Sequence, residues 1–330
     1  MTKVKIFSGS NTKSLGESVA QAYHKTSLNK TKFTRFSDGE FIVSIDETVR
    51  GTNTYVIQST SQPTDNLFEL LMMGDALKRA SAKNRVAVIP YMGFARQDKK
   101  DQPRVPIGMK MVADMIETAG FTRVLAIDLH VDQIQGFFNI PVDHLSASYV
   151  FIPYVKSLNL DNLIFASPDV GGTKRAKKFA DAFNTDLVIC HKTRPQANIV
   201  GEMKLIGDVK GKNVIIIDDI CDTAGTLSKA ANLIKESGAL SVRAMITHPV
   251  LSGGAYNNIE KSVLCELITT DTIPLRDEKE FVDYEKSTKK ITILSVDKML
   301  ANIINLINNN ESVSSIFEIK NGTDKNKKYE

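Results

Sequence analysis

Short runs of aliphatic and β-branched residues alternate with amphipathic stretches along most of the chain. The apolar runs lie at 4–9, 54–59, 85–90, 123–130, 162–169, 187–192, 213–219, 243–250, 262–270 and 290–296. Helical patterns fall between them at 65–83, 107–119, 172–183, 226–237 and 297–308. Apolar strands that are separated by helices indicate parallel sheets covered on both faces. Residues 41–45, FIVSI, alternate better and favour an antiparallel edge or flap.

This alternation of strands and helices occurs twice, with a break near residues 145–154. A chain of 330 residues is long enough for two domains. We therefore predict an α/β protein of two similar domains, each a mainly parallel sheet flanked by helices. The expected limits are 1–147 and 148–308, with 309–318 able to pack back onto the first domain and 319–330 as a polar tail.

Charge and cysteine content narrow the class of protein. The 42 basic and 38 acidic residues give a net charge of +4, which is too weak to indicate a nucleic-acid surface. Cys190, Cys221 and Cys265 form no zinc-binding spacing and no disulfide framework, which fits a reducing compartment. The N-terminus lacks the apolar run of a signal peptide, and no apolar stretch is long enough for a bilayer. We predict a soluble cytoplasmic protein without a membrane or nucleic-acid partner.

Polar clusters follow several of the predicted strands. They are DLH at 128–130, SPDVGG at 167–172, HKTRP at 191–195 and DDICDTAGT at 218–226. In open parallel sheets, ligands bind beyond the carboxyl ends of the strands. We therefore expect these four clusters to converge on one site.

The stretch VIIIDDICDTAGTL at 214–227 combines two kinds of ligand-binding group. After the strand, the loop residues can direct backbone amides and hydroxyls at one point ahead of a helix, which favours a phosphate; they are Thr223, Ala224, Gly225 and Thr226. The glycine lets the backbone approach closely. The loop resembles neither a Walker loop nor a GxGxxG turn.

Three carboxylates in the same stretch, Asp218, Asp219 and Asp222, would repel a phosphate but accept hydrogen bonds from hydroxyl groups. A ligand with a phosphate at one end and vicinal hydroxyls nearby satisfies both halves of the motif, as a pentose 5-phosphate does. Two acids alone could simply cap a strand and begin a helix. The third acid and the TAGT sequence favour a ligand site.

The stretch also resembles the phosphoribosyl pyrophosphate loop that type I phosphoribosyltransferases share with ribose-phosphate pyrophosphokinases. Further motifs resemble the class I pyrophosphokinases in the family's order, namely RFSDGE (35–40), ARQDKKD (95–101), DLHVDQIQGFFNIPVD (128–143), SPDVGG and HKTRP. The resemblance implies two type I phosphoribosyltransferase-like domains. It also implies ribose-phosphate diphosphokinase activity, in which ATP and ribose 5-phosphate give 5-phosphoribosyl 1-pyrophosphate and AMP.

The resemblance assigns roles to residues that spacing alone leaves open. Lys192 and Arg194 match the catalytic loop, although a basic turn is the commoner meaning of such a pair. His130 and Asp169 match the positions that hold Mg²⁺. The expected ATP contacts are Phe36, Asp38, Glu40, Arg96, Gln97, Asp101 and His130, and the first three come from a neighbouring subunit in the family. A homohexamer built from dimers is also implied.

Departures from the family concern regulation. Gln102 and Pro103 stand where the family often has Lys-Ser, in a segment that contributes to an allosteric phosphate/ADP site together with the region of Ser312–Ser314. Two other functions remain as alternatives. A phosphoribosyltransferase would use the same loop but would not need the 35–40 and 95–101 motifs. A non-catalytic regulatory relative tends to lose the catalytic-loop residues, and Lys192 and Arg194 are both present.

Overall fold

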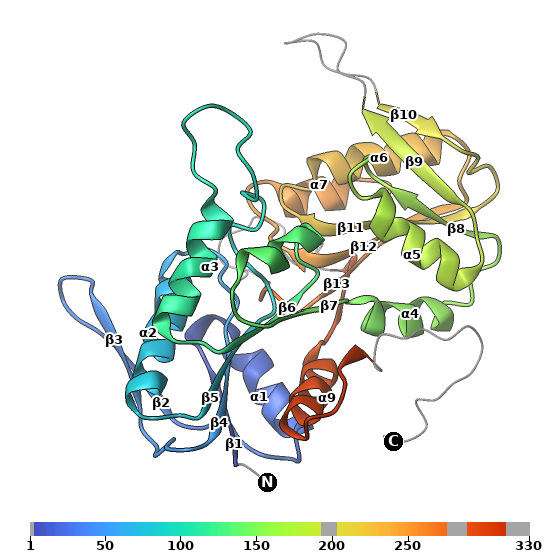
Figure 1. The fold of residues 1–330 in the computed structure, drawn as a ribbon. Coiled ribbons are helices and arrows are strands. Elements are labelled where there is room, and N and C mark those ends of the chain that lie inside the picture. The colour runs from blue at the N-terminus through green and yellow to red at the C-terminus, as the bar shows by residue number, and fades with distance from the viewer. Residues whose placement is uncertain (1–2, 193–202, 276–288, 315–330) are drawn as a thin grey trace.

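The computed structural model describes residues 3–192, 203–275 and 289–314, and they form two parallel sheets joined by shared helices (Figure 1). The first sheet has the order β1 (Val4–Ser8), β4 (Asn53–Ile57), β5 (Asn84–Ile89), β6 (Arg123–Ile127) and β7 (Val142–Leu145), all parallel. The predicted α/β architecture with mainly parallel sheets is confirmed.

The second sheet is larger and has one antiparallel edge strand. Its order is β10 (Met203–Ile206), β9 (Leu187–Lys192), β8 (Leu163–Ser167), β11 (Asn213–Cys221), β12 (Ser241–Pro249), β13 (Glu266–Thr270) and β14 (Ile291–Leu294). Only β10 runs antiparallel to its neighbour among the paired strands of this sheet that the structure describes. A separate antiparallel hairpin joins β2 (Thr31–Arg35) to β3 (Phe41–Ile45), as the alternation of FIVSI predicts.

Helices cover both faces of each sheet. The longer ones are α1 (Lys13–Ala22), α2 (Asp65–Arg79), α3 (Gly108–Ala119), α4 (Ser148–Ser157), α5 (Thr173–Phe183), α6 (Gly225–Glu236), α7 (Ala255–Lys261) and α9 (Asp297–Asn308), and the 3-10 helices are η1 (Ser10–Thr12) and η2 (Asp132–Phe137). In the described ranges, no helix combines the length and the apolar content that crossing a membrane requires.

Three apolar cores hold these layers together. One lies between α2, α3 and the first sheet, and another lies between α6, α7 and the second sheet. The third is shared, since it includes Leu125 of the first sheet, Ile268 of the second and Leu300 of α9. Helix α9 follows the last strand of the second sheet but packs against α1, and Asn53 donates a hydrogen bond to Asn308 at 2.8 Å. The two sheets are therefore fixed relative to one another by burial of a common core.

Several elements differ from the sequence-based expectations. Helix α1 was not expected, because Gly16 weakens its helical pattern; a Cβ there would meet the Ser8 side chain at 2.5 Å, so the glycine permits close helix–strand packing. Helix α2 ends at Arg79, four residues before the expected end at residue 83. The chain turns there at Ser81, which has a φ of 63°. The strand expected at 262–270 begins only at Glu266, because the preceding residues complete α7 and its turn.

Candidate functional site

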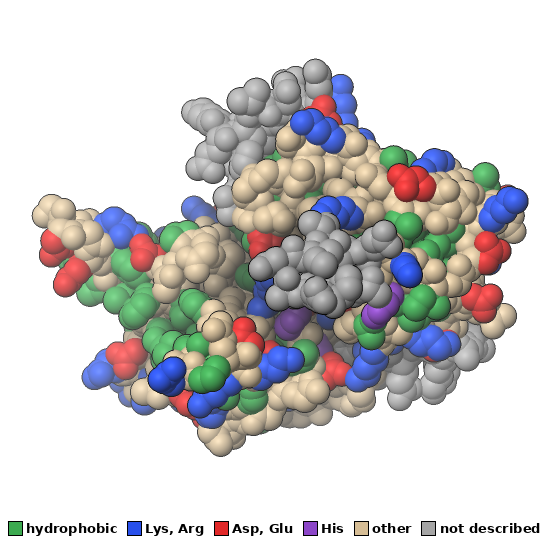
Figure 2. Space-filling view, turned by 90° about the horizontal axis from the view of Figure 1, so that it is seen from above, with side chains coloured by type: hydrophobic (Ala, Val, Ile, Leu, Met, Phe, Trp, Pro, Cys, Tyr) green, Lys and Arg blue, Asp and Glu red, His purple; other side chains and the backbone are tan. Residues whose placement is uncertain are grey.

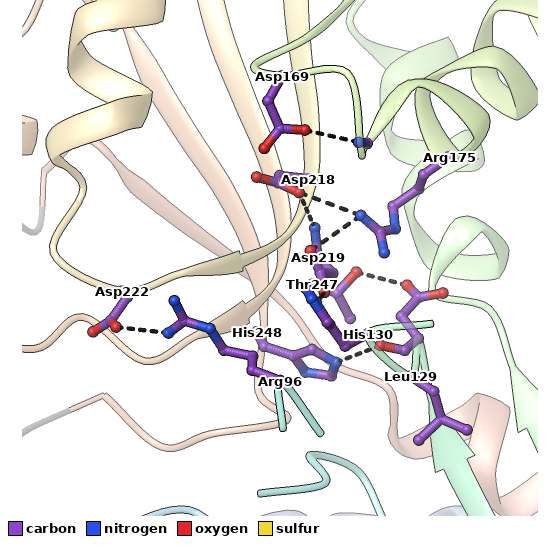
Figure 3. Close-up of polar contacts among 12 residues, drawn as sticks. Arg96, Leu129, His130, Asp169, Arg175, Asp218, Asp219, Asp222, Thr247 and His248 are labelled. Carbon is purple, nitrogen blue, oxygen red and sulfur yellow. Dashed lines mark hydrogen bonds and ion pairs between the residues drawn. The ribbon is translucent and has the colours of Figure 1, made fainter. Parts of the chain in front are cut away.

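The candidate site lies where the carboxyl ends of the two sheets face each other (Figure 3). The loop after β6 brings His130 from the first sheet, and β11 brings Asp218 and Asp219 from the second. Three of the four clusters that were expected to converge meet here, at 128–130, 167–172 and 218–226. In the fourth, the described backbone places Lys192 at the end of β9, and Arg194 lies outside the described residues.

Asp219 is the centre of the polar network. It is buried, with 4% of its surface exposed, and its Oδ2 accepts a hydrogen bond from His130 Nδ1 at 2.8 Å. Arg175, on the first turn of α5, donates to Asp219 Oδ1 at 3.1 Å and to Asp218 Oδ1 at 3.3 Å. A carboxylate only accepts, so Nδ1 carries the hydrogen, and Nε2 is the ring nitrogen left for a ligand.

The two neighbouring carboxylates ionise differently. Burial raises the pKa of Asp218 well above its usual range, and the adjacent charge of Asp219 adds to the rise. Burial acts in the same direction on the pKa of Asp219, but the hydrogen bond from His130 and the charge of Arg175 outweigh it and hold that pKa below its usual range. Asp219 is therefore the ionised member, and Asp218 has the most to gain from an added cation or hydrogen-bond donor.

Asp169 lies in the loop that connects β8 to α5. It is close to Asp218, which belongs to β11. Its Oδ1 accepts from the Gly172 amide at 2.8 Å, and a Cβ on Gly172 would lie 3.7 Å from both Asp169 Oδ1 and Asp218 Oδ1. The two carboxylates therefore lie close to the same glycine, and both offer the hard oxygen donors that suit Mg²⁺. Within the described residues, no three acidic, histidine or cysteine side chains form a complete metal site. Magnesium commonly takes its remaining ligands from phosphates and water, so the donor set fits a metal that arrives with a substrate.

The loop at 222–226 leaves an open cradle at the start of α6. Its left-handed residue is Ala224, with a φ of 59°, and the helix begins at Gly225 instead of residue 226. Of the described neighbours outside its own helix, a Cβ on Gly225 would meet only Thr223 Oγ1, at 3.7 Å, so packing against them does not require this glycine. Among the residues that the structure describes, no side chain caps the helix, which leaves its first-turn amides available for an anion.

Asp222 connects the loop to residues from two other elements. Arg96, in the loop after β5, donates from Nη1 to Asp222 Oδ2 at 3.0 Å, and the Ser252 hydroxyl donates to Oδ1. Arg96 therefore reaches the site from the first sheet. Gln97 and Asp101 are exposed in the same loop, and Gln97 lies against Gly108.

Three of the residues expected to contact ATP lie away from the acidic cluster. Phe36, Asp38 and Glu40 form the tip of the β2–β3 hairpin, which projects away from the carboxyl end of β11 (Figure 1). Phe36 is 50% exposed, and Asp38 accepts a hydrogen bond from the Glu40 amide. A single copy of the chain therefore does not bring these three residues to the acidic cluster.

Several site residues escaped the sequence analysis. Arg175 lies three residues after Gly172, in the first turn of the helix that follows β8. This position close to a strand end was the signal from which its role could have been predicted. Ser252 and Thr247 lie after or within β12 without any motif of their own. A cavity of about 250 Å³ adjoins the site, with Lys174, Arg175 and Thr247 among its lining residues.

Known proteins match nearly the whole chain. A family model described as the N-terminal domain of ribose phosphate pyrophosphokinase matches residues 4–120, and one described as the phosphoribosyl synthetase-associated domain matches residues 192–318. A ribose-phosphate pyrophosphokinase from Wolinella succinogenes is 51% identical over 318 residues, which cover 96% of this chain and 100% of the relative. One from Porphyromonas gingivalis is 48% identical over 94% of this chain and 97% of its own length.

A solved structure supports the same grouping. The crystal structure of phosphoribosylpyrophosphate synthetase from Mycobacterium smegmatis superposes with a TM-score of 0.85 at 38% sequence identity. The superposition covers 94% of this chain and 100% of the other. The likeness therefore extends over both sheets and their shared helices.

Proposed function

The chain belongs to the ribose-phosphate pyrophosphokinase family, and we propose that it transfers the pyrophosphoryl group of ATP to the C1 hydroxyl of ribose 5-phosphate. The products are 5-phosphoribosyl 1-pyrophosphate and AMP, which supply nucleotide and amino-acid biosynthesis. The observation that carries this proposal is the pairing of an open amide cradle at 223–226 with ionisable carboxylates at 218, 219 and 222. The amides suit the 5-phosphate, and the carboxylates suit the ribose hydroxyls.

The proposed mechanism depends on positioning and on positive charge. The C1 hydroxyl attacks the β-phosphorus of ATP and loses its proton to solvent, the bond from that phosphorus to the α-phosphate oxygen breaks, and AMP leaves with that oxygen. Arg96 and His130 orient the ATP phosphates, and Lys192 and Arg194 place positive charge on the transferring oxygens. Asp169 and His130 are the proposed ligands of Mg²⁺, and Asp218 supplies a further oxygen donor beside Asp169. These residues would hold Mg²⁺, which would supply positive charge against the phosphates.

An exposed apolar surface around the hairpin supports self-association at the proposed ATP site. Large apolar side chains are exposed on the hairpin and on the helices beside it; they are Phe33, Phe36 and Ile42, with Phe68 and Met72 on α2 and Met111 on α3. Figure 2 shows hydrophobic side chains gathered on the side of the molecule that carries the hairpin. Such a surface is typical of a protein interface. We propose that a second copy covers it and that the hairpin completes the neighbour's ATP site within a homohexamer.

Complementation between subunits tests this arrangement. Phe36→Ala and Asp219→Ala are each expected to inactivate the protein, whereas co-expression of the two variants should restore part of the activity. Restoration requires that one active site uses Phe36 of one copy and Asp219 of another. Mixed oligomers with no restored activity would contradict the shared site.

The reaction itself is tested by incubating the protein with ATP, ribose 5-phosphate and Mg²⁺ and measuring AMP. We expect stoichiometric AMP and 5-phosphoribosyl 1-pyrophosphate. A phosphoribosyltransferase would instead consume the second product together with a base, and a regulatory relative would form no AMP.

The role of Lys192 is tested by Lys192→Ala, with Lys204→Ala on the neighbouring strand β10 as the matched control. We expect kcat to fall about 10³-fold while the KM values change less than about threefold, because the lysine acts on charge that develops in the transition state. A variant that mainly raised the KM values would contradict this role.

Regulation and location remain predictions from the sequence. Gln102 and Pro103 are exposed, and the described residues of the C-terminal segment end at Ser314. A titration of activity with inorganic phosphate, with and without ADP, decides whether the proposed allosteric site operates. We also propose that the protein acts in the cytoplasm, where its phosphorylated substrates occur.

A further inference from the structure

Two buried residues of β12 contact the end of β6 across the boundary between the two sheets. Asp128, the first residue after β6, has a left-handed φ of 37°. Its Oδ2 accepts hydrogen bonds from Thr247 Oγ1 at 2.6 Å and from the Ala147 amide at 3.2 Å. A left-handed conformation is unfavourable for a residue with a side chain, so it persists only where its surroundings hold it. Thr247, from the other sheet, supplies one of these contacts.

His248 holds the same turn through the backbone. It is 2% exposed, and its Nε2 lies 3.1 Å from the Ile127 carbonyl oxygen and 3.2 Å from that of Asp128. Carbonyl oxygens only accept, so Nε2 carries the hydrogen. Its Nδ1 carries no hydrogen in the neutral ring and lies 3.0 Å from Thr272 Oγ1, which also lies 3.0 Å from the Thr247 carbonyl oxygen. Burial lowers the pKa of His248, against the opposing charge of Asp128, which keeps the ring in this neutral form.

The turn that these residues hold leads directly to His130. Only Leu129 separates Asp128 from His130, and Leu129 is buried, with its amide donating to His144 Nε2 at 2.9 Å. A change in the backbone at Asp128 would therefore rotate His130 relative to Asp219, whose Oδ2 lies 2.8 Å from Nδ1. Figure 3 shows Thr247, His248 and His130 gathered around the same turn.

We propose that Thr247 and His248 are positioning residues, which hold the end of β6 so that His130 stays on Asp219. This inference rests on the proposed role of His130 at the ATP phosphates. Both residues are buried, at 1% and 2% exposure. They act through the Asp128 turn, so the second sheet fixes a functional residue that belongs to the first.

The competing explanation is that Thr247 contributes only to general packing between the two sheets. A second contact between the sheets distinguishes this explanation from the proposal. Asn53 donates to Asn308 Oδ1 at 2.8 Å at the amino end of β4, away from the β6 turn. Loss of that contact should weaken the join between the sheets without moving His130. Asn308→Ala is therefore the matched control for a loss at Thr247.

The experiment uses the full-length protein and compares Thr247→Val, Thr247→Ser and Asn308→Ala by steady-state kinetics and thermal unfolding. Valine keeps the volume and removes the hydroxyl, whereas serine keeps the hydroxyl. We expect Thr247→Val to lower kcat about tenfold with the KM for ribose 5-phosphate changed less than about twofold. Thr247→Ser should restore kcat to within about twofold, and Asn308→Ala should change only the melting temperature. If Thr247→Val does not fold, Thr247→Ala takes its place.

A double-mutant cycle with His130→Ala decides whether Thr247 acts through His130. In the His130→Ala background, Thr247→Val should lower kcat by less than about twofold. An independent tenfold loss in that background, or no rescue by serine, would overturn the inference while leaving the role of His130 intact. A His130→Ala variant with wild-type kcat would show instead that the proposed role of His130 is wrong, and the inference would fall with it.

Discussion

Each half of the chain places a polar cluster with a buried carboxylate near the carboxyl ends of its strands, and the two clusters are built differently. In the first half, Glu69 of α2 is 4% exposed and accepts from the Ser10 amide at 3.0 Å, the Ser10 hydroxyl at 2.6 Å and Gln58 Nε2 at 3.0 Å. The glycine beside this cluster, Gly9, is enclosed, since a Cβ there would lie 2.4 Å from the Gln58 side chain. Neutral donors from the chain itself satisfy this carboxylate.

The cluster in the second half is less complete. Asp218 and Asp219 share one guanidinium, and burial leaves Asp218 with a raised pKa. Gly225 beside them faces open space apart from Thr223 Oγ1. The comparison teaches that burial of a carboxylate does not by itself indicate function. The second cluster differs in two ways. Its negative charge is only partly compensated by other residues, and it lies next to a cradle that the described side chains do not fill.

The largest expected effect comes from Asp219→Ala, which removes the acceptor shared by His130 and Arg175. We expect kcat/KM for ribose 5-phosphate to fall about 10³-fold, because a buried ligand contact is lost and the two donors lose their partner. Steady-state kinetics with each substrate varied in turn measures the effect. The KM for ATP should change much less, and equal losses for both substrates would count against the sugar-hydroxyl role. Asp186→Ala, at an exposed carboxylate in the loop just before β9, is the control.

Glu69→Ala should have the opposite profile. Three donors lose their acceptor in a buried setting, so the free energy of unfolding should fall by about 2–4 kcal/mol. The kcat per folded molecule should stay within about twofold of wild type. Urea unfolding followed by active-site titration measures both quantities, and Asp75→Ala on the exposed side of α2 is the control. A fall in kcat without a fall in the free energy of unfolding would show that Glu69 serves catalysis, as is proposed for the second cluster.

The two glycines give a smaller, paired test. Gly9→Ala should destabilise the protein by about 1–3 kcal/mol, because the methyl group would overlap the Gln58 side chain. Gly225→Ala should leave the melting temperature unchanged and raise the KM for ribose 5-phosphate about tenfold, because its methyl group would occupy the phosphate cradle. Thermal unfolding and kinetics on both variants are sufficient. Equal losses of melting temperature would show that both glycines serve packing alone.

The smallest expected effect is a pH-dependent change in stability. The pKa of Asp218 is raised in the folded state, so its ionised form opposes folding above that pKa, and the penalty disappears as the pH falls toward the unfolded value of about 4. Asp218→Asn should therefore raise the melting temperature of the ligand-free protein by a few degrees at pH 7 and change it little near pH 4.

Asp219→Asn is the counterpart with the opposite sign. The pKa of Asp219 is lowered in the folded state, so its charge stabilises the fold at neutral pH, and this contribution is lost as the pH falls through the folded pKa. Its replacement by asparagine should lower the melting temperature at pH 7. Thermal unfolding of both variants at the two pH values completes the test, and shifts of the same sign would contradict the assigned ionisation.

The local pattern of residues was sufficient to predict most of the second sheet and the acidic loop. The apolar runs at 162–169 and 213–219 become β8 (Leu163–Ser167) and β11 (Asn213–Cys221), because apolar residues that are buried on both faces favour parallel strands. The carboxylates and the amide cradle of 218–226 lie within nine consecutive residues, so their spacing was visible before any tertiary contact was known. What these residues do locally follows from their own chemistry.

Only the tertiary structure decided which distant groups complete the site. Arg175 meets Asp219 across 44 positions in the sequence, and Thr247 meets Asp128 across 119, so no local pattern connects them. The same holds for α9, which follows the second sheet but packs on α1. A side chain's partners depend on how whole sheets are buried against one another, and that burial is set by the shared core, which no single stretch of sequence contains.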